Sequence, residues 1–241
     1  MPWFTQLGCC IHTSPSNYKV YDNFFFRWLT LDSKVLQTVI HKKKPSHPFL
    51  YYLPAMTLMV RSIPAPTCLL GLGGAGLLHM LRPYPVPLTV VEKNKEVIDI
   101  AQNYFMLDKL PPFELIHQPA EQYLHTAARS YTHLLVDIYN HQSFPPECST
   151  AAFFQDCHTA IEEHGYLAVN VANAGEQLFL LQLIQNYFNH TLVIPIKNCS
   201  NVVIIASKQP GKNLFLDNIL LNKEIKKIQW VKDIGYVGTL Y

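Results

Sequence analysis

Five short, almost continuously apolar runs alternate with helical patterns from residue 67 onward, and this alternation constrains the fold more than any other feature. The runs are TCLLGLG (67–73), VPLTVVE (86–92), FELIH (113–117), THLLVDIY (132–139) and GYLAVNVA (165–172). Strands that are apolar along their whole length are typical of a parallel sheet covered by helices on both faces. The pattern therefore predicts a doubly wound α/β domain.

The segments between these runs have the spacing of amphipathic helices. Residues 94–105 repeat their apolar side chains at helical intervals, residues 149–164 begin with a Ser/Thr cap, and residues 175–188 form a third segment of this kind. Each of these segments is long enough to carry the chain from one parallel strand to the next.

The last two apolar runs, residues 190–196 and 200–207, are separated by only three residues. They must pair as an antiparallel hairpin, because a crossover between parallel strands needs a dozen residues or more. Five parallel strands followed by such a hairpin resemble the class I AdoMet-dependent methyltransferase sheet more than an NAD-binding domain, which disfavours an NAD-dependent oxidoreductase. The expected fold is therefore α/β, with a seven-stranded doubly wound sheet.

The two ends of the chain have other patterns. Residues 1–47 contain strand-like alternation around turn signals and are expected to form a small N-terminal antiparallel β domain. Residues 48–241 are then the methyltransferase-like α/β domain. Within it, a helical pattern at 48–63 should be kinked or broken at Pro54, and the tail from 212 to 241 is expected to be helical.

Composition excludes several classes of partner. The chain has 241 residues, of which 49% are hydrophobic, so it can bury a full core; 19 basic residues balance 17 acidic ones without a basic stripe, which predicts no nucleic-acid partner. The sequence shows neither an apolar run long enough for a membrane span nor a secretory signal, so no membrane partner and a cytoplasmic location are expected. The six cysteines lack CxxC spacing and are interpreted as thiols, with no metal site.

A glycine-rich turn follows the first core strand. Gly71, Gly73 and Gly76 satisfy the GxGxxG pattern, which lets backbone N–H groups and the helix dipole approach a ligand. Glu92, at the end of the second strand, is placed to accept hydrogen bonds from both ribose hydroxyls of a dinucleotide or an adenosyl cofactor. The alternative is that the glycines serve close packing and Glu92 is only a solvated strand end.

Asp137 ends the predicted fourth strand at the edge of the sheet where ligands of such folds bind. An aspartate after four apolar residues is costly to bury unpaired, so it either caps the next segment or serves chemistry. Tyr139 and Asn140 follow on the same loop and are expected to line an acceptor pocket.

These residues resemble the spermidine synthase (polyamine aminopropyltransferase) family over most of the chain. RWLTLDSKVLQ (27–37) is similar to the family's LDGxxQ hairpin, with Gln37 at the glutamine, and YYLPAM (51–56) is similar to its YxxxM or YHE segment, with Tyr52 at the tyrosine. GLGGAG, VVEKNKEVIDIAQNYF and LLVDIYN match the family's glycine motif, its VEIDxxVxxxAxxYF segment and its VDxxDP segment.

The resemblance implies transfer of an aminopropyl group from decarboxylated AdoMet to a small amine such as putrescine or another polyamine, in a homodimer that needs no metal. Asp137 would be the base or the amine-orienting residue. The cofactor-binding residues would be Gly71, Gly73, Gly74, Gly76, Glu92, Gln118 and Ala120, and the substrate-binding residues Gln37, Tyr52, Tyr139 and Asn140.

The chain departs from the family at several acidic positions. Gly74 stands where the family places an aspartate for the aminopropyl amine, and Asn140 stands at the second VDxxDP aspartate. Pro119 replaces an aspartate that accepts from the adenine amino group, which leaves Gln118 or backbone carbonyls, and Lys19 replaces a glutamine.

Without the loop acid, the helix N-terminus favours the carboxylate of intact AdoMet. Two alternatives therefore stay open beside aminopropyl transfer: an AdoMet-dependent methyltransferase, and a non-catalytic protein that binds an adenosyl nucleoside.

Overall fold

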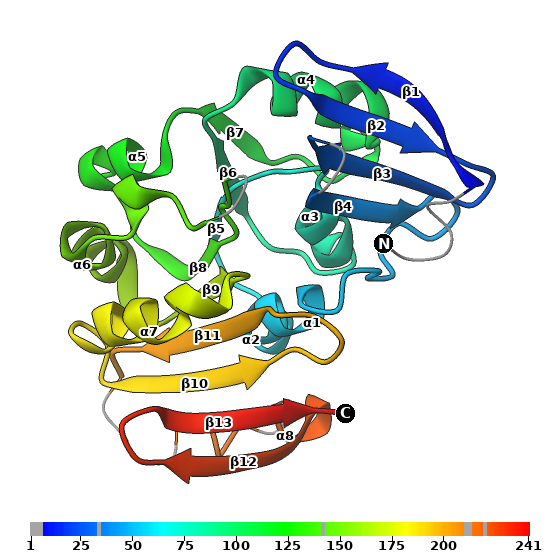
Figure 1. Ribbon diagram of the computed structural model, residues 1–241. Coiled ribbons are helices and arrows are strands. Elements are labelled where there is room, and N and C mark those ends of the chain that lie inside the picture. The colour runs from blue at the N-terminus through cyan, green and yellow to red at the C-terminus, as the bar shows by residue number, and fades with distance from the viewer. Residues whose placement is uncertain (1–6, 33–34, 141–142, 210–213, 219–220) are drawn as a thin grey trace.

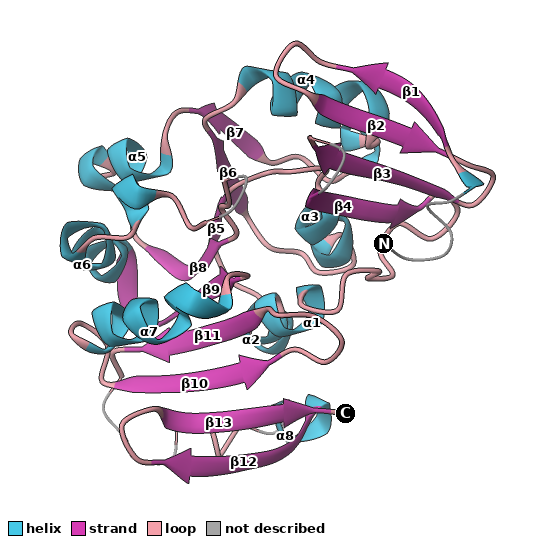
Figure 2. Ribbon diagram, in the orientation of Figure 1, coloured by secondary structure: helices cyan, strands magenta, loops and turns pink. Residues whose placement is uncertain are grey.

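A computed structural model describes residues 7–32, 35–140, 143–209, 214–218 and 221–241. The chain forms two sheets, a four-stranded sheet at the N-terminus and a nine-stranded sheet that continues to the C-terminus (Figure 1). Figure 2 shows that the helices lie almost entirely against the larger sheet.

The N-terminal sheet is antiparallel throughout, with the strand order β1-β2-β3-β4. Its strands are β1 (Cys9–Thr13), β2 (Tyr18–Asp22), β3 (Phe26–Leu31) and β4 (Val35–His41). Val20, Leu29 and Ile40 pack against Ile100 and Phe105 of the α/β domain, so the small sheet shares a core with the larger one. The expected N-terminal antiparallel sheet is thereby confirmed, while its boundary at residue 47 stays a prediction.

The nine-stranded sheet has the order β12-β13-β10-β11-β9-β8-β5-β6-β7. Its strands are β5 (Thr67–Leu70), β6 (Leu88–Glu92), β7 (Glu114–His117), β8 (Tyr131–Val136), β9 (Ile161–Val171), β10 (His190–Pro195), β11 (Val202–Ser207), β12 (Ile225–Val231) and β13 (Gly235–Leu240). Strands β5 to β9 are parallel, and β11 runs antiparallel to both β9 and β10. The predicted methyltransferase-like arrangement of five parallel strands and a hairpin is confirmed, but β12 and β13 extend the expected seven-stranded sheet to nine strands.

Helices cover both faces of this sheet, as the apolar runs predict (Figure 1). They are α1 (Leu53–Met56), α2 (Leu58–Ser62), α3 (Gly76–Leu81), α4 (Lys95–Tyr104), α5 (Ala120–Thr126), α6 (Ala151–Ala160), α7 (Gln177–Gln185) and α8 (Leu221–Glu224). Leu69 faces the core formed with α1 to α4, whereas its neighbours Cys68 and Leu70 face the core formed with α5 to α7. Because successive side chains of β5 enter opposite cores, all of them must be apolar.

Pro54 lies in the first turn of α1, where its missing N–H has no hydrogen bond to lose. The expected break in the segment 48–63 is present, but it falls at Thr57, between α1 and α2. The helix begins at Leu53, one residue before this proline, and ends at Met56.

The prediction of a C-terminal helical tail is wrong for the described residues. Only α8 is helical; β12 and β13 form a hairpin, and β13 pairs in parallel with β10. The turn between them uses left-handed backbone conformations at Asp233 and Gly235. The edge of β10 supplies hydrogen bonds that local helix propensity cannot match, and a pattern within the tail itself does not reveal that partner.

Arg61 fixes the tail to the rest of the fold. Its guanidinium group pairs with Glu224 of α8 and also donates to the carbonyl of Pro54 at 2.9 Å. One side chain thus joins α1, α2 and α8. Among the described residues, no helix is long and apolar enough to span a membrane.

Candidate functional site

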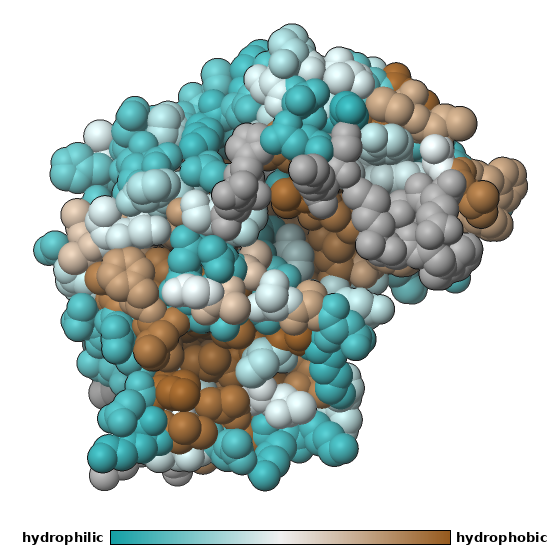
Figure 3. Space-filling model, in the orientation of Figure 1, coloured by the Kyte–Doolittle hydropathy of each residue, from teal (hydrophilic) through white to brown (hydrophobic). Residues whose placement is uncertain are grey.

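A cavity of about 810 Å³ opens at the carboxyl ends of the central strands. The wall that faces these strand ends comes from β3 and β4 of the N-terminal sheet and from residues 49–53, the last of which is the first residue of α1. Figure 3 shows the hollow between the two sheets, with hydrophobic atoms on the side of the N-terminal sheet. The chain runs from β5 to β6 and β7 on one side and returns to β8 and β9 on the other, so the cavity lies at the topological switch point.

Gly71 is required where β5 and β8 end side by side. Its backbone has a φ of +94°, and a Cβ atom there would lie 2.2 Å from the carbonyl oxygen of Asp137. An L-residue at this position would meet both a strained backbone and a direct clash. This glycine therefore lets the first strand end within contact distance of the strand that carries Asp137.

Glu92 closes the glycine loop from β6. One carboxylate oxygen accepts the N–H of Leu72 at 3.0 Å, and the other accepts the N–H of Asn94 at 2.8 Å. Burial raises the pKa of Glu92, and the two N–H donors oppose that rise. Since each carboxylate oxygen has a second lone pair, Glu92 can still accept two hydroxyl groups from the cavity.

Gly74 faces away from the cavity, against β4. Its N–H donates to Thr38 Oγ1 at 2.8 Å, and a Cβ atom at position 74 would lie 2.8 Å from Thr38 Cβ. The N–H of Leu72 is taken by Glu92, and that of Ala75 by the carbonyl of Leu72. Three N–H groups of the loop are thus engaged within the protein, which removes much of the basis for expecting a carboxylate to bind there.

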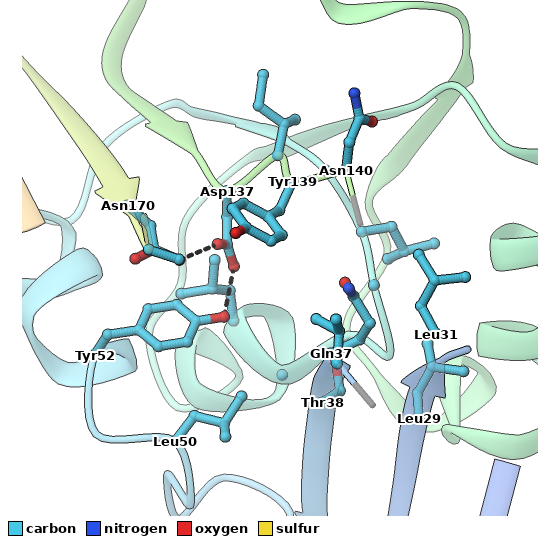
Figure 4. A pocket seen from close by; sticks show the side chains of 18 of the residues that line it. Leu29, Leu31, Gln37, Thr38, Leu50, Tyr52, Asp137, Tyr139, Asn140 and Asn170 are labelled. Carbon is cyan, nitrogen blue, oxygen red and sulfur yellow. Dashed lines mark hydrogen bonds between the residues drawn. The ribbon is translucent and has the colours of Figure 1, made fainter. Parts of the chain in front are cut away.

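Asp137 is held by two donors from different elements (Figure 4). The hydroxyl of Tyr52 donates to Oδ2 at 3.0 Å, and Asn170 Nδ2 donates to Oδ1 at 2.8 Å. Asn201 Nδ2 in turn donates to Asn170 Oδ1 at 2.8 Å, which orients that amide. Burial raises the pKa of Asp137, and both hydrogen bonds counteract the rise.

Tyr52 keeps its proton in this arrangement. Burial, followed by the charge of Asp137, raises the pKa of Tyr52 well above its usual value. The hydroxyl is therefore a permanent donor to the carboxylate, and the carboxylate points from the end of β8 into the cavity.

A β-bulge brings Gln37 to the cavity. Leu29 pairs with Thr38 but Thr30 pairs with Leu36, so Gln37 is the extra residue on β4. Figure 4 shows its side chain extending from β4 into the space in front of Asp137. Bulges commonly redirect a side chain next to a binding site.

Most residues singled out in the sequence meet in this one cavity. Those that line it are Gln37, Tyr52, Gly71, Gly73, Gly76, Glu92, Ala120, Asp137, Tyr139 and Asn140. Gly74 and Gln118 do not line it; Gln118 contributes its N–H to the carbonyl of Glu92 at 3.1 Å. Lys19 also lies outside the lining.

Thr38, Asn170 and Asn201 were not singled out by sequence. Asn170 could have been recognised from the sequence, because an asparagine inside a buried apolar strand needs hydrogen-bond partners. Thr38 and Asn201 could not, since their partners Gly74 and Asn170 are distant in the chain. Among the described residues, no three metal-ligating side chains come together; the absence of a metal stays a prediction.

No protein-family model matches the chain. A polyamine aminopropyltransferase from Chromobacterium violaceum is 26% identical over 190 residues, which cover 76% of this chain and 73% of that protein. The crystal structure of spermidine synthase from Thermotoga maritima matches with a TM-score of 0.68 at 16% identity, covering 87% of this chain and 78% of that one. The chain is therefore similar to a polyamine aminopropyltransferase in sequence and to a spermidine synthase in fold.

The wider fold is that of the methyltransferases. Human methyltransferase-like protein 13, solved in complex with SAH, matches with a TM-score of 0.61 at 16% identity, over 72% of this chain and 91% of that one. Both the resemblance drawn from the motifs and the expected fold class are confirmed.

The contact between Gly74 and Thr38 predicts unequal effects of two neighbouring substitutions. Gly74→Ala should lower the free energy of unfolding by about 1–3 kcal/mol, because its Cβ overlaps Thr38. Gly76→Ala is the matched control: its Cβ would meet atoms no closer than 3.5 Å, at the first residue of α3, and it should be neutral or slightly stabilising. Urea denaturation measures both, and equal losses of stability would contradict the proposed packing.

Proposed function

We propose that the protein transfers the aminopropyl group of decarboxylated AdoMet to an amine. The observation that carries the proposal is the Asp137 carboxylate, fixed by Tyr52 and Asn170 and directed into the cavity that also holds Glu92. A carboxylate at that place can hold an ammonium group and take its proton. The similarity to a polyamine aminopropyltransferase supports the same reaction.

The adenosine half of the donor belongs at the β6 side of the cavity. Glu92 would accept the two ribose hydroxyls, while Gly71 and Gly73 let the ligand approach the loop backbone. Ala120, at the start of α5, lines the same end. This placement leaves the sulfonium and the propyl chain pointing toward Asp137.

The charges of the cavity favour a cationic donor. The described lining residues include four carboxylates and one lysine: Glu92, Glu121, Asp137, Glu147 and Lys93. Lys93 Nζ is already 3.2 Å from Glu147. Decarboxylated AdoMet carries an ammonium and a sulfonium, whereas intact AdoMet adds a carboxylate that would find no free lysine or arginine among these residues.

The reaction then needs little from the protein beyond position and one proton acceptor. Asp137 takes a proton from the acceptor ammonium, and the neutral amine attacks the propyl carbon bonded to sulfur. The new C–N bond forms as the C–S bond breaks, and its electron pair returns to sulfur. Methylthioadenosine leaves as a neutral thioether, and the product is a secondary ammonium.

Methyl transfer is the second candidate, and the lack of an acid at Gly74 is the observation that favours it. The products separate the two reactions: aminopropyl transfer releases methylthioadenosine, and methyl transfer releases S-adenosylhomocysteine. Homodimerisation is part of the proposal through the resemblance alone. A cytoplasmic location is supported by the six cysteines, all of them described and free.

Replacing Glu92 tests the donor site. Glu92→Gln keeps the shape of the side chain but replaces one acceptor oxygen with an NH₂ group, which is a donor. The dissociation constant of methylthioadenosine should therefore rise roughly 10- to 100-fold. Glu96→Gln, four residues later and outside the cavity lining, is the control and should leave binding unchanged. Isothermal calorimetry gives both constants; unchanged affinity in Glu92→Gln would exclude the ribose contact.

Replacing Asp137 tests the chemical step. Asp137→Asn should lower kcat roughly 100- to 10,000-fold while methylthioadenosine still binds, because the base is lost and the donor site is intact. Burial raises the pKa of this carboxyl, which means that the ionised form destabilises the folded state when the pH is above that pKa. The neutral amide should therefore keep or raise the free energy of unfolding at neutral pH. Retained turnover with decarboxylated AdoMet would reject the role of Asp137.

Replacing Tyr52 tests the ionisation of Asp137 through the pH dependence of kcat/KM. The hydrogen bond from Tyr52 lowers the pKa of Asp137, so Tyr52→Phe should raise that pKa further. Activity requires the ionised carboxylate and is lost as pH falls through its pKa, which moves the acidic limb of the kcat/KM profile to higher pH. Tyr51→Phe, at an exposed neighbour, should leave the limb in place; an unmoved limb in Tyr52→Phe would show that the two groups are not coupled.

A further inference from the structure

We propose that the acceptor is a primary monoamine with an apolar body, such as an alkylamine or arylalkylamine, and not a diamine. This inference rests on the proposed aminopropyl transfer and concerns the part of the cavity beyond Asp137. It follows from where the carboxylates lie, which polar groups replace them, and what the remaining wall is made of.

The strand order divides the cavity into two halves. Glu92 is the last residue of β6, Glu121 belongs to α5 after β7, and Glu147 lies in the 3₁₀ turn Pro146–Cys148 next to Lys93. These three acids therefore belong to the adenosine side. Asp137 and Asn170 come from β8 and β9, on the other side of β5. Asp137 is the one carboxylate that lines this acceptor half among the described residues.

The residues outside the described ranges have no carboxylate side chain to add to this one. Residues 1–6, 33–34, 141–142, 210–213 and 219–220 contain no aspartate and no glutamate. Two described acids come near without lining the cavity: Asp32 is exposed at the β3–β4 turn, and Glu176 accepts the N–H of Phe144 at 3.0 Å.

The other polar groups of the acceptor half are uncharged. They include the amides of Gln37, Asn140, Asn170, Asn198 and Asn201 and the hydroxyls of Tyr52, Tyr139 and Ser200. Asn170 already donates to Asp137, as Figure 4 shows, and Asn201 donates to Asn170. A diamine would add a second ammonium to this space, next to the ammonium of the donor itself, and Asp137 would be the single negative charge for all three.

The wall opposite Tyr52 carries several apolar side chains. Leu29 and Leu31 from β3 stand across the cavity from Tyr52, with Leu50 below it (Figure 4). Leu36 and Phe49 line the same wall. An ammonium against leucine side chains loses its hydration without gaining a partner, whereas a methyl group there is removed from water favourably.

A matched pair of amines tests the inference directly. In n-pentylamine a methyl group replaces the second ammonium of 1,4-diaminobutane, so the two differ in charge and hardly in length. With decarboxylated AdoMet, kcat/KM should be at least about tenfold higher for n-pentylamine, and calorimetry on the methylthioadenosine-loaded protein should show the same order of affinity. Equal or better use of 1,4-diaminobutane would overturn the inference.

A substitution on the apolar wall should reverse the preference. Leu50 lies in a loop and is partly exposed, so Leu50→Glu adds a carboxylate to the acceptor half, and Leu50→Gln suffers the same loss of apolar packing. It should raise kcat/KM for 1,4-diaminobutane relative to n-pentylamine by at least about tenfold, while Leu50→Gln, of the same shape without the charge, should not. A reversal by both variants, or by neither, would count against the inference.

The failures of the two proposals are distinguishable. Release of methylthioadenosine with diamines alone would overturn the monoamine inference and leave aminopropyl transfer standing. If no amine supports release and methylthioadenosine does not bind, aminopropyl transfer fails. If methylthioadenosine binds but neither amine binds the loaded protein, the acceptor inference is rejected by binding alone.

Discussion

The hydrogen bond from the Gly74 N–H to Thr38 Oγ1 joins the two sheets at the point where the cavity forms. Together with the shared core of Leu29, Ile40 and Phe105, it holds the wall that carries Gln37 opposite Asp137. The bond also explains why an acid is missing from the loop: the space above Gly74 belongs to Thr38. One contact thus determines both the shape of the site and its charge.

The sequence predicts the central sheet well because its determinants are local. Apolar strands, the glycine turn and a three-residue hairpin connection are each readable within a few residues, and Gly71, Glu92 and Asp137 meet at one end of the sheet as expected. The tail was not predictable, since β12 and β13 are strands only because β10 offers an edge. For the same reason Asn201 was missed: its role depends on a partner in another strand.

The site places a carboxylate where burial disfavours its charge. Burial raises the pKa of Asp137, and its two neutral hydrogen bonds, with no cation among the groups bonded to it, compensate its charge only in part. A fold that sought stability alone would put a neutral side chain there. An incompletely compensated acid is instead suited to meet a positively charged ligand, whose arrival supplies the missing partner.

The C-terminal hairpin has a consequence for the behaviour of the protein at high concentration. By pairing with β10, it turns an apolar strand into an interior one and moves the edge of the sheet to β12. The new edge carries the exposed lysines 226 and 227. Charged edge strands resist pairing with strands of other chains, so the tail protects the sheet against aggregation through its open side.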